Sequence, residues 1–311
     1  MSDRVAFLNG EIVPEADAKI SIRDAGVVYG DGVFDTARTF DGKLFRMAEH
    51  VERLFESLAY ARIDPGMTRE EILTATEKLV QANRSVLRKG EDYWVTVRIT
   101  SGQQAFDGEV AANAGSTVMI DAVPLPLRAR ANYFRDGIKA VVPGRRRVAP
   151  EALSPNAKTN NYMNMIIAQR EVAAVSPGSW ALMLDPNGDM AEGPGSNFFV
   201  VRHGVVFTPT KEFVLAGVSR QVVIELCAKL GIECREQTLP LHAAMVADEA
   251  FFTSTSLCVC PVSHLNGAAY PSTVPGPVTK WIMDGFADLV GHDYVGQYLR
   301  FAGGSGVNAG L

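Results

Sequence analysis

Residues 192–201 have the sequence Glu-Gly-Pro-Gly-Ser-Asn-Phe-Phe-Val-Val, a glycine-rich turn that runs directly into an apolar strand. Gly193 and Gly195 lack a Cβ, so the backbone here can approach a ligand closely. Glu192 is then in a position to face the ring nitrogen of a pyridine-type cofactor and keep it protonated, which makes the cofactor a stronger electron sink. An ordinary turn before a strand explains the same residues equally well when they are considered alone.

Two segments further along the chain have the composition of anion-binding sites. Residues 215–220, Leu-Ala-Gly-Val-Ser-Arg, precede a helix predicted over residues 221–230, and the first backbone N–H groups of a helix attract a phosphate. Residues 252–256, Phe-Thr-Ser-Thr-Ser, end a predicted strand with hydroxyl groups that can also hold a phosphate. Taken separately, an N-cap serine at Ser219 and a simple serine–threonine turn are the more frequent explanations.

Lys158 and Arg53 are the two cations that stand out before these segments. Lys158 lies among small polar residues just before an apolar helix predicted near residues 162–174, a setting in which a lysine can provide the amine of a Schiff base. Arg53 lies on the polar face of a helix predicted over residues 47–61, and it would bind a phosphate bidentately if that face met the second domain. Most lysines and arginines are solvated surface residues, so neither signal is specific alone.

Local patterns predict several elements of the N-terminal part of the chain. The apolar residues of segment 47–61 recur at helical spacing. Thr68-x-x-Glu71 has the form of a capping box and predicts the start of a second helix. Asn9-Gly10 lies between two apolar runs and is a strong hairpin signal. These patterns favour a fold of mixed α and β structure.

A domain boundary is predicted where two prolines follow each other closely. Pro124 and Pro126 disfavour both a helix and a central strand, so residues 124–131 are expected to be an interdomain linker. Hairpins dominate the sequence before this point, whereas strands and helices alternate after it. We therefore expect a small domain at residues 1–123 and a larger one at residues 132–311.

The overall composition excludes several classes of protein. Hydrophobic residues make up 47% and charged residues 21% of the 311 residues, which is typical of a globular protein. The net charge is −5 and the densest basic cluster, Arg145 to Arg147, is expected to be a solvated loop, so a nucleic-acid binder is not indicated. No apolar run reaches the roughly 18 residues of a membrane span, and the first residues lack the apolar core of an export signal. A cytoplasmic enzyme without membrane or nucleic-acid partners is the expectation.

The cysteines indicate neither a metal site nor a disulfide framework. Cys227, Cys234, Cys258 and Cys260 match no zinc spacing, and four cysteines in 311 residues are too few for a disulfide scaffold. A disulfide between Cys258 and Cys260 would be strained, so packing of small buried side chains is favoured over a redox role.

The order of these motifs is more specific than any one of them. An arginine, a lysine, Glu-Gly-x-Gly-x-Asn before a strand, Gly-Val-Ser-Arg at a helix start and Thr-Ser-Thr-Ser follow one another along the chain. In this order the sequence resembles the class IV (fold type IV) pyridoxal-phosphate-dependent aminotransferases over about residues 5–290, and the branched-chain amino acid aminotransferases are most similar. The resemblance rests on Asn9-Gly10, Tyr29-Gly30, Phe34-Asp35, Arg38, His50-x-x-Arg53-Leu54, Ala157-Lys158, Glu192-Gly193, Asn197, Leu215, Gly217-Val218-Ser219-Arg220 and Gly276-Pro-Val-Thr-Lys280.

The resemblance implies an α+β fold of two domains, a cofactor and an assembly. The small N-terminal α/β domain would be followed by a larger PLP-binding domain of β-barrel-like sheets with helices. The cofactor would be pyridoxal 5'-phosphate (PLP), and the protein would form a homodimer or a larger homo-oligomer.

The resemblance also assigns roles to individual residues. Lys158 would form the Schiff base with PLP and later move a proton, and Glu192 would pair with the pyridine nitrogen. Leu215 would pack under the ring, and Tyr162 would bond to the phenolic oxygen, although Lys-x-x-x-Tyr is one residue shorter here than in typical branched-chain enzymes. The phosphate would be held by Arg53, Val218, Ser219 and Thr255.

The substrate residues implied by the resemblance depart from the branched-chain pattern. That pattern usually has glycine at Thr36 and arginine at the position of Thr96, while D-amino-acid and (R)-amine transaminases often have arginine at Ser101. The implied substrate contacts are Tyr29, Phe34, Thr36, Arg38, Arg98 and Ser256.

The expected activity is therefore transfer of an amino group from an amino acid, branched-chain or aliphatic in preference, to a 2-oxo acid by a ping-pong mechanism. An (R)-amine or D-amino acid transaminase that uses pyruvate is the main alternative. A lyase resembling aminodeoxychorismate lyase is less favoured, because its dianionic substrate would need more cations than Arg38 and Arg98.

Overall fold

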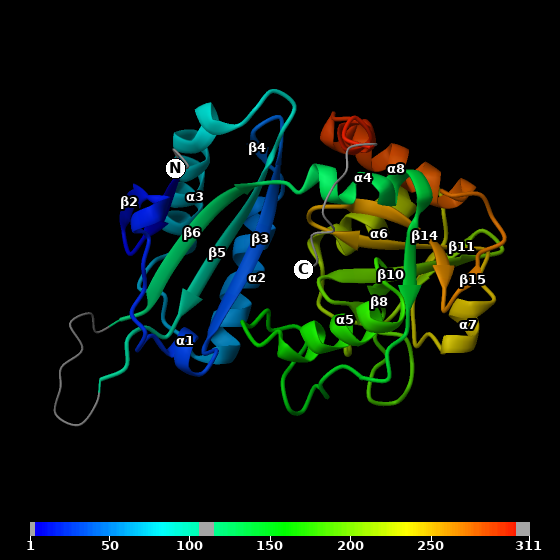
Figure 1. Cartoon of the computed structure of the whole chain (residues 1–311), viewed down its shortest axis with the longest axis horizontal. Helices are drawn as coiled ribbons and strands as arrows, with labels where there is room; N and C mark the ends of the chain where they lie inside the picture. The colour runs from blue at the N-terminus through cyan, green and yellow to red at the C-terminus, as the bar shows by residue number, and fades with distance from the viewer. Residues whose placement is uncertain (1–3, 106–114, 303–311) are drawn as a thin grey trace. The chain divides into compact units, whose positions relative to one another are not determined.

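Two compact units divide the chain in the computed structural model, which describes residues 4–105 and 115–302 (Figure 1). The first unit contains Met1–Leu125 together with Ala157–Asn161. The second unit contains Pro126–Asn156 and Tyr162–Leu311. Each unit has its own sheet and its own helices, and each is described separately below.

The described part of the first unit contains a six-stranded antiparallel sheet with the strand order β2-β1-β6-β5-β3-β4. Helices α2 and α3 cover one face of this sheet (Figure 1). The predicted hairpin is confirmed, since Leu8 pairs with Glu11 across Asn9 and Gly10, which both have positive φ. The elements are β1 (Val5–Leu8), β2 (Glu11–Pro14), α1 (Ala25–Val28), β3 (Gly32–Phe40), β4 (Lys43–Leu44), α2 (Met47–Ala61), α3 (Arg69–Asn83), β5 (Tyr93–Thr100) and β6 (Thr117–Pro124).

Side-chain alternation along β3 and β5 gives the sheet two different faces. Val33 and Ala37 of β3 and Val97 of β5 belong to the apolar core that packs against α2 and α3. Because successive side chains of a strand point to opposite faces, Phe34 and Arg98, which pair across the two strands, lie on the other face. Helix α2 has the predicted bounds, and its Leu54 is fully buried. One face of the sheet therefore packs in the core, and the other carries the candidate site residues Phe34 and Arg98.

The segment that contains Lys158 joins the first unit although it lies far along the chain. Thr159 forms a β-bridge with Val33, and the amide of Asn160 donates to the carbonyl of Gly32 at 2.8 Å. The carbonyl of Lys158 accepts from the amide of Phe34 at 2.9 Å. Residues 157–161 thus pair with the start of β3, so the first unit contains two separate stretches of the sequence.

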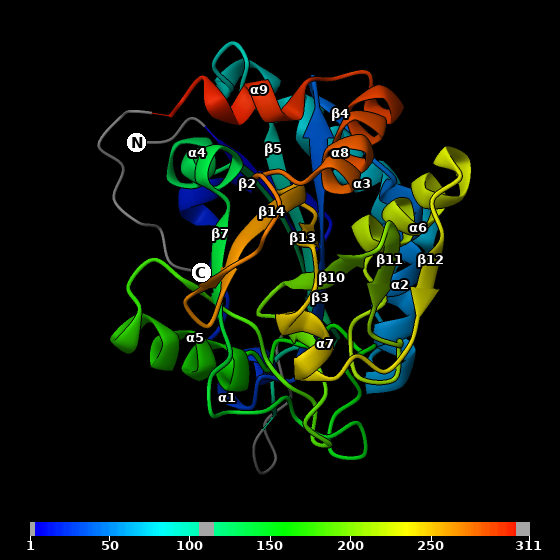
Figure 2. The same cartoon turned by 90° about the vertical axis from the view of Figure 1, so that its right-hand side faces the viewer.

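The described part of the second unit contains a mixed nine-stranded sheet with the order β12-β11-β10-β13-β14-β7-β8, to which β9 and β15 add at β10 and β14. Figure 2 shows β10, β13 and β14 in the middle of this sheet. The elements are α4 (Leu127–Asp136), β7 (Ile138–Val141), α5 (Met163–Val175), β8 (Trp180–Ala181), β9 (Glu192–Gly193), β10 (Ser196–Arg202), β11 (Val205–Thr208), α6 (Val218–Leu230), β12 (Cys234–Glu236), α7 (Leu241–Met245), β13 (Glu249–Ser254), β14 (Cys258–Leu265), β15 (Ala268–Ala269), α8 (Pro277–Val290) and α9 (Tyr294–Leu299).

The boundary between the two units falls between Leu125 and Pro126, inside the segment predicted as a linker, but most of that segment has regular secondary structure. Pro124 still belongs to β6, and helix α4 begins at Leu127. Pro126 occupies the N-cap position, where the missing N–H of proline costs the helix nothing. The two prolines therefore mark the start of a helix, and Arg130 becomes a residue of a structured element.

Candidate active site

Lys158 is held firmly by the first unit. Its amide donates to Ser57 Oγ at 3.0 Å, and its Nζ lies over the ring of Phe34, 4.4 Å from the ring centre. The side chain is partly buried, so the alternative of a fully solvated surface lysine does not apply. The backbone contacts fix the origin of the side chain, and the ring of Phe34 provides an apolar wall beside the amine.

Arg98 reaches the same aromatic ring. Its guanidinium carbon lies 5.4 Å from the centre of the Phe34 ring, and its Nε donates to Asn160 Oδ1 at 3.3 Å. Burial raises the pKa of the nearby Asp121, and the charge of Arg98 opposes that rise. Two of the predicted residues, Lys158 and Arg98, are therefore brought to one ring in one unit.

Thr36 lies two residues after Phe34 in β3, and Thr96 lies two residues before Arg98 in β5. They pair across β3 and β5, and their hydroxyl oxygens are 3.1 Å apart. Thr36 is buried. The branch that replaces the usual glycine thus occupies space on the face that carries Phe34.

Arg53 is engaged by an internal carboxylate. Its Nε and Nη2 donate to the two oxygens of Asp35, each at 2.8 Å, and His50 Nδ1 lies 2.7 Å from Asp35 Oδ1. Burial raises the pKa of Asp35, but the charges and hydrogen bonds of Arg53 and His50 lower it by more. The pKa of Asp35 therefore lies well below its usual value. Burial lowers the pKa of His50. One edge of the Arg53 guanidinium is thus committed to Asp35, which fixes its orientation.

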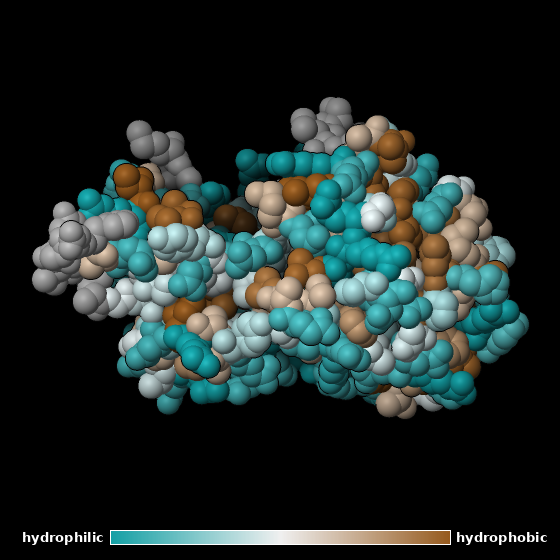
Figure 3. All heavy atoms as spheres, turned by 90° about the horizontal axis from the view of Figure 1, so that it is seen from below, coloured by the Kyte–Doolittle hydropathy of each residue, from teal (hydrophilic) through white to brown (hydrophobic). Residues whose placement is uncertain are grey.

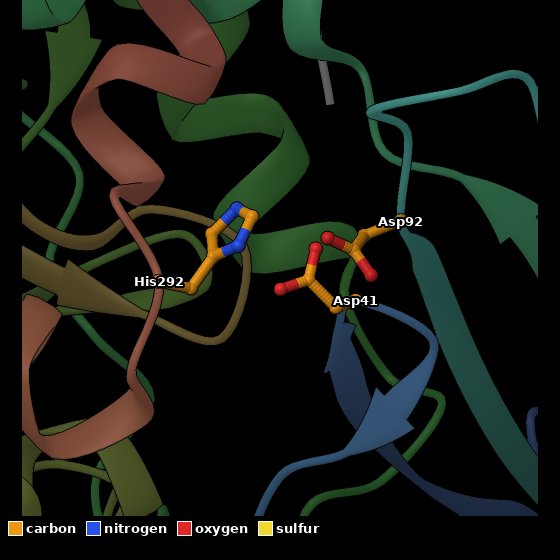
Figure 4. A group of neighbouring side chains, drawn as sticks. All are labelled: Asp41, Asp92 and His292. Carbon is orange, nitrogen blue, oxygen red and sulfur yellow. The ribbon is translucent and has the colours of Figure 1, made fainter.

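Arg38 is buried near the far end of β3. Its Nε donates to the carbonyl of Thr39 at 3.1 Å, its guanidinium lies 4.0 Å from the centre of the Phe40 ring, and its Nη2 is 4.0 Å from Asp92 Oδ2. The carboxylates of Asp92 and Asp41 lie close together in Figure 4, and His292, also drawn there, belongs to the second unit. These contacts favour a structural role for Arg38, and its role in substrate binding stays a prediction.

Glu192 is the centre of a buried polar cluster in the second unit. Its Oε2 accepts from the amide of Leu215 at 3.1 Å and from Asn197 Nδ2 at 3.2 Å. Its Oε1 lies 2.9 Å from Arg147 Nη2, and the two side chains are only 4% and 9% exposed. The arrangement stabilises an ionised carboxylate, which is the form that a protonated pyridine nitrogen requires.

Arg147 is a site residue that the sequence analysis missed, and the prediction of a solvated basic loop is wrong for it. Arg145 and Arg146 are exposed as expected, but Arg147 turns inward to pair with Glu192. Glu192 was expected to face a cofactor ring, where a carboxylate is removed from water and needs a counter-charge, and that requirement was the available signal.

The start of α6 is suited to an anion. The helix begins at Val218, earlier than the predicted 221, and its N-cap Gly217 supplies no side-chain cap. A Cβ on Gly217 would collide with Asn197 Oδ1, and the Asn197 amide is held by hydrogen bonds to Glu192 and to the carbonyl of Leu215, so glycine is favoured here. The N-terminal turn, with Ser219, therefore presents its backbone donors next to the carboxylate site.

The hydroxyl-rich end of β13 lies beside the same cluster. Thr253 pairs with Asn197 across β13 and β10, and Thr255 and Ser256 follow at the end of the strand. Thr253 Oγ1 and Ser196 Oγ are buried and have no hydrogen-bond partner among the described residues. Buried polar atoms of this kind need a partner. The donor set, the buried carboxylate and the helix start together fit a phosphorylated pyridine cofactor.

The remaining residues singled out from the sequence are Tyr162, Tyr29 and the cysteines. Tyr162 is partly buried and packs against the cluster around Met165 and Ala168 in the second unit. Tyr29 follows α1 and is 64% exposed. None of the four cysteines, all of which lie in the described residues, forms a disulfide, and Cys258 and Cys260 are buried, in agreement with a packing role.

Comparison with known proteins defines the family. The sequence matches Amino-transferase class IV over residues 32–265, and the chain belongs to this family. The branched-chain-amino-acid aminotransferase of Escherichia coli (strain K12) is 32% identical over 291 residues, which cover 91% of this chain and 92% of the relative. The D-alanine aminotransferase of Bacillus licheniformis is 29% identical over 276 residues, with 88% and 93% covered.

Solved structures share the fold as well. A crystal structure of Escherichia coli branched-chain amino acid aminotransferase matches with a TM-score of 0.84 at 30% identity and covers 93% of this chain and 95% of that one. The branched-chain amino acid aminotransferase from Thermobaculum terrenum, solved in its PLP-form, has a TM-score of 0.81 at 27% identity, with 96% and 97% covered. The chain is thus a PLP-dependent aminotransferase of mixed α and β fold. No helix within residues 4–105 and 115–302 is long and apolar enough to cross a membrane.

Proposed function

We propose that this chain moves an amino group between a branched-chain or other aliphatic L-amino acid and a 2-oxo acid. The observation that carries the proposal is the position of Lys158 Nζ, 4.4 Å from the centre of the Phe34 ring, because an apolar wall then stands beside the reactive amine. Such a wall favours aliphatic substrate side chains. The names of the relatives support the same substrate class.

Residues from each unit are proposed to hold PLP. When bound, PLP supplies an electron sink for the carbanion that forms at the substrate Cα. In the first unit, Lys158 would bind the cofactor covalently and Arg53 would contact its phosphate. In the second unit, Glu192 would face the pyridine nitrogen. The remaining proposed contacts are Tyr162 at the phenolic oxygen, Leu215 under the ring, and Val218, Ser219 and Thr255 at the phosphate.

The side chains then divide the work of the reaction. Lys158 takes the proton from the Cα of the amino donor. In the second half-reaction it gives a proton to the Cα of the amino acid that forms. Arg147 keeps Glu192 ionised through their 2.9 Å contact. Phe34 and Thr36 limit the size of the substrate side chain. Arg98 shares the Phe34 ring and would bind the second carboxylate of a dicarboxylic partner such as 2-oxoglutarate.

A D-amino acid or (R)-amine transaminase that uses pyruvate is the second candidate. The similarity to a D-alanine aminotransferase, 29% identical over 88% of this chain, favours it specifically. The replacement of the branched-chain arginine by Thr96 also leaves the carboxylate arrangement of this chain different from the usual branched-chain pattern.

Assembly and location belong to the same proposal. Ile22, Val27 and Tyr29, which lie in or near α1, are 86%, 56% and 64% exposed, and exposed apolar groups of this kind favour contact with a second copy. Apolar side chains also gather at several places on the face drawn in Figure 3. All four cysteines are thiols, as is typical of proteins in a reducing compartment, so we place a homodimer in the cytoplasm.

A panel of amino donors tests the proposal. The PLP-loaded protein is mixed with L-leucine, D-alanine or (R)-1-phenylethylamine without an acceptor, and conversion to pyridoxamine 5'-phosphate is followed by absorption. Fastest conversion by L-leucine supports the proposal. Fastest conversion by D-alanine or the amine establishes the second candidate. Release of pyruvate from aminodeoxychorismate without an acceptor, with the cofactor remaining as PLP, would show a lyase instead.

A further inference from the structure

Arg130 lies in the segment that was expected to be a linker. It is instead a partly buried residue of helix α4 in the second unit. Its Nη1 donates to the hydroxyl oxygen of Ser256. Its guanidinium carbon lies 5.9 Å from the centre of the Trp180 ring. The titratable groups that face it are the phenols of Tyr298 and Tyr133 and the thiol of Cys260, and burial lowers the pKa of Arg130 itself.

The turn that receives Arg130 is buried and held by several contacts. Ser256 is 2% exposed, and its carbonyl accepts a hydrogen bond from Tyr298 Oη at 2.6 Å. The ring of Tyr298 stacks on Phe134 of α4 at 4.5 Å between ring centres. Leu257 N donates to Ser254 Oγ at 3.2 Å. A positive charge is therefore fixed against a turn that two helices, α4 and α9, hold in place.

This turn adjoins the proposed cofactor residues within the same unit. Thr253, two residues before Thr255, pairs with Asn197, which contacts Glu192. Arg130 thus contacts the turn that follows, along the chain, the β13 residue paired with the Glu192 cluster. An arginine offers five donors in a planar fork that matches a carboxylate, and partial burial beside aromatic rings strengthens such a contact.

We propose that Arg130, with the hydroxyl of Ser256, binds the α-carboxylate of the amino acid and of the 2-oxo acid. The proposal rests on the transaminase function proposed above and names how that site recognises its substrates. The α-carboxylate is common to donors and acceptors, so Arg130 acts in both half-reactions, whereas Arg98 beside Phe34 acts only on substrates with a second carboxylate. The phosphate is assigned to the α6 start, because the helix N–H groups already provide for it.

The test compares Arg130→Gln with Arg128→Gln, which removes an exposed arginine of the same helix. The first readout is the half-reaction with L-leucine and with a primary amine that lacks a carboxylate. The second is binding of 4-methylvalerate, with the corresponding alcohol as the neutral control. Arg130→Gln should weaken the L-leucine reaction and 4-methylvalerate binding about 10- to 150-fold, mainly in KM, and leave the amine and the alcohol unchanged. Arg128→Gln should change neither.

Three outcomes overturn the proposal. Equal losses for L-leucine and the amine would make Arg130 a structural residue. A loss of PLP affinity with an unchanged ratio between the two donors would make it a phosphate ligand. No loss at all would leave it without a role in binding. If Arg130→Gln does not fold, Arg130→Lys and Ser256→Ala carry the same comparison, and Tyr298→Phe should leave the ratio unchanged. If the wild-type protein converts no donor, the proposed function itself fails and this inference fails with it.

Discussion

Replacement of Asp35 by asparagine tests the role of the buried pair in the first unit. Asp35 is 1% exposed in its side chain, and it accepts two hydrogen bonds from Arg53 at 2.8 Å each. Asparagine keeps the size of the side chain but removes the negative charge. The guanidinium of Arg53, whose side chain is only 9% exposed, would then be left without the carboxylate that compensates its burial.

The magnitude follows from the geometry. Removal of one partner from a buried ion pair costs about 3–5 kcal/mol, because the other charge stays desolvated. A typical domain has a free energy of unfolding of about 5–15 kcal/mol, so the first unit should lose a large part of its stability. Because Asp35 orients Arg53, the affinity for PLP should also fall.

The assay uses the tryptophan of the first unit. Trp94 lies in β5, whereas Trp180 and Trp281 belong to the second unit, so Trp180→Phe and Trp281→Phe leave a fluorescence signal from the first unit alone. Urea unfolding of this background is compared with and without Asp35→Asn. The midpoint should shift strongly at an unchanged slope.

A matched control comes from helix α2, which carries both Arg53 and Glu52. Glu52 and Arg69 form an ion pair with similar two-bond geometry, at 2.7 and 3.1 Å, but both side chains are more than half exposed. Glu52→Gln should leave the midpoint within measurement error, because exposed pairs are solvated and screened. A loss below about 1 kcal/mol for Asp35→Asn, or equal losses for the two variants, would refute the argument that burial makes this pair important.

Three further predictions follow from the same contacts. Arg147→Met should cost about 3–5 kcal/mol of stability and weaken PLP binding, because Glu192 is buried and loses its 2.9 Å partner; an unchanged urea midpoint would contradict this. Arg98→Gln should slow the half-reaction with L-glutamate about 10- to 150-fold and spare L-leucine, whereas equal effects in stopped-flow measurements would assign Arg98 another role. The lowered pKa of Asp35 means that its contribution to stability is fully present above the usual value of about 4 and is lost as the pH falls below it, so the difference in unfolding free energy between wild type and Asp35→Asn should narrow from pH 5 towards pH 2.

Local features of the fold could be predicted because they depend on nearby residues. The helix over residues 47–61, the capping box of Thr68 with Glu71 and the hairpin at Asn9-Gly10 all have the predicted form. Each is decided by side chains a few residues apart, which a sequence displays directly.

Long-range pairings could not be predicted in the same way. The bridge between Thr159 and Val33 and the ion pair between Arg147 and Glu192 join residues far apart in the sequence. No spacing rule connects such residues, so the basic loop looked solvated. Pro126 led to the prediction of an irregular segment where a helix begins. A proline is excluded from a helix interior but suits the position just before the first helical residue.

The central claim is that Lys158 is the lysine of a PLP-dependent transaminase, and single-turnover conversion by L-leucine tests it most directly. PLP-loaded wild type, Lys158→Ala and Lys139→Ala, which changes an exposed lysine of β7, are mixed with L-leucine, and formation of pyridoxamine 5'-phosphate is timed. We predict complete conversion by wild type and Lys139→Ala and a rate at least about 100-fold lower for Lys158→Ala, together with loss of the absorption of the lysine-bound cofactor. Conversion by Lys158→Ala at the wild-type rate, or lysine-bound absorption that disappears only when another lysine is replaced, would contradict the claim.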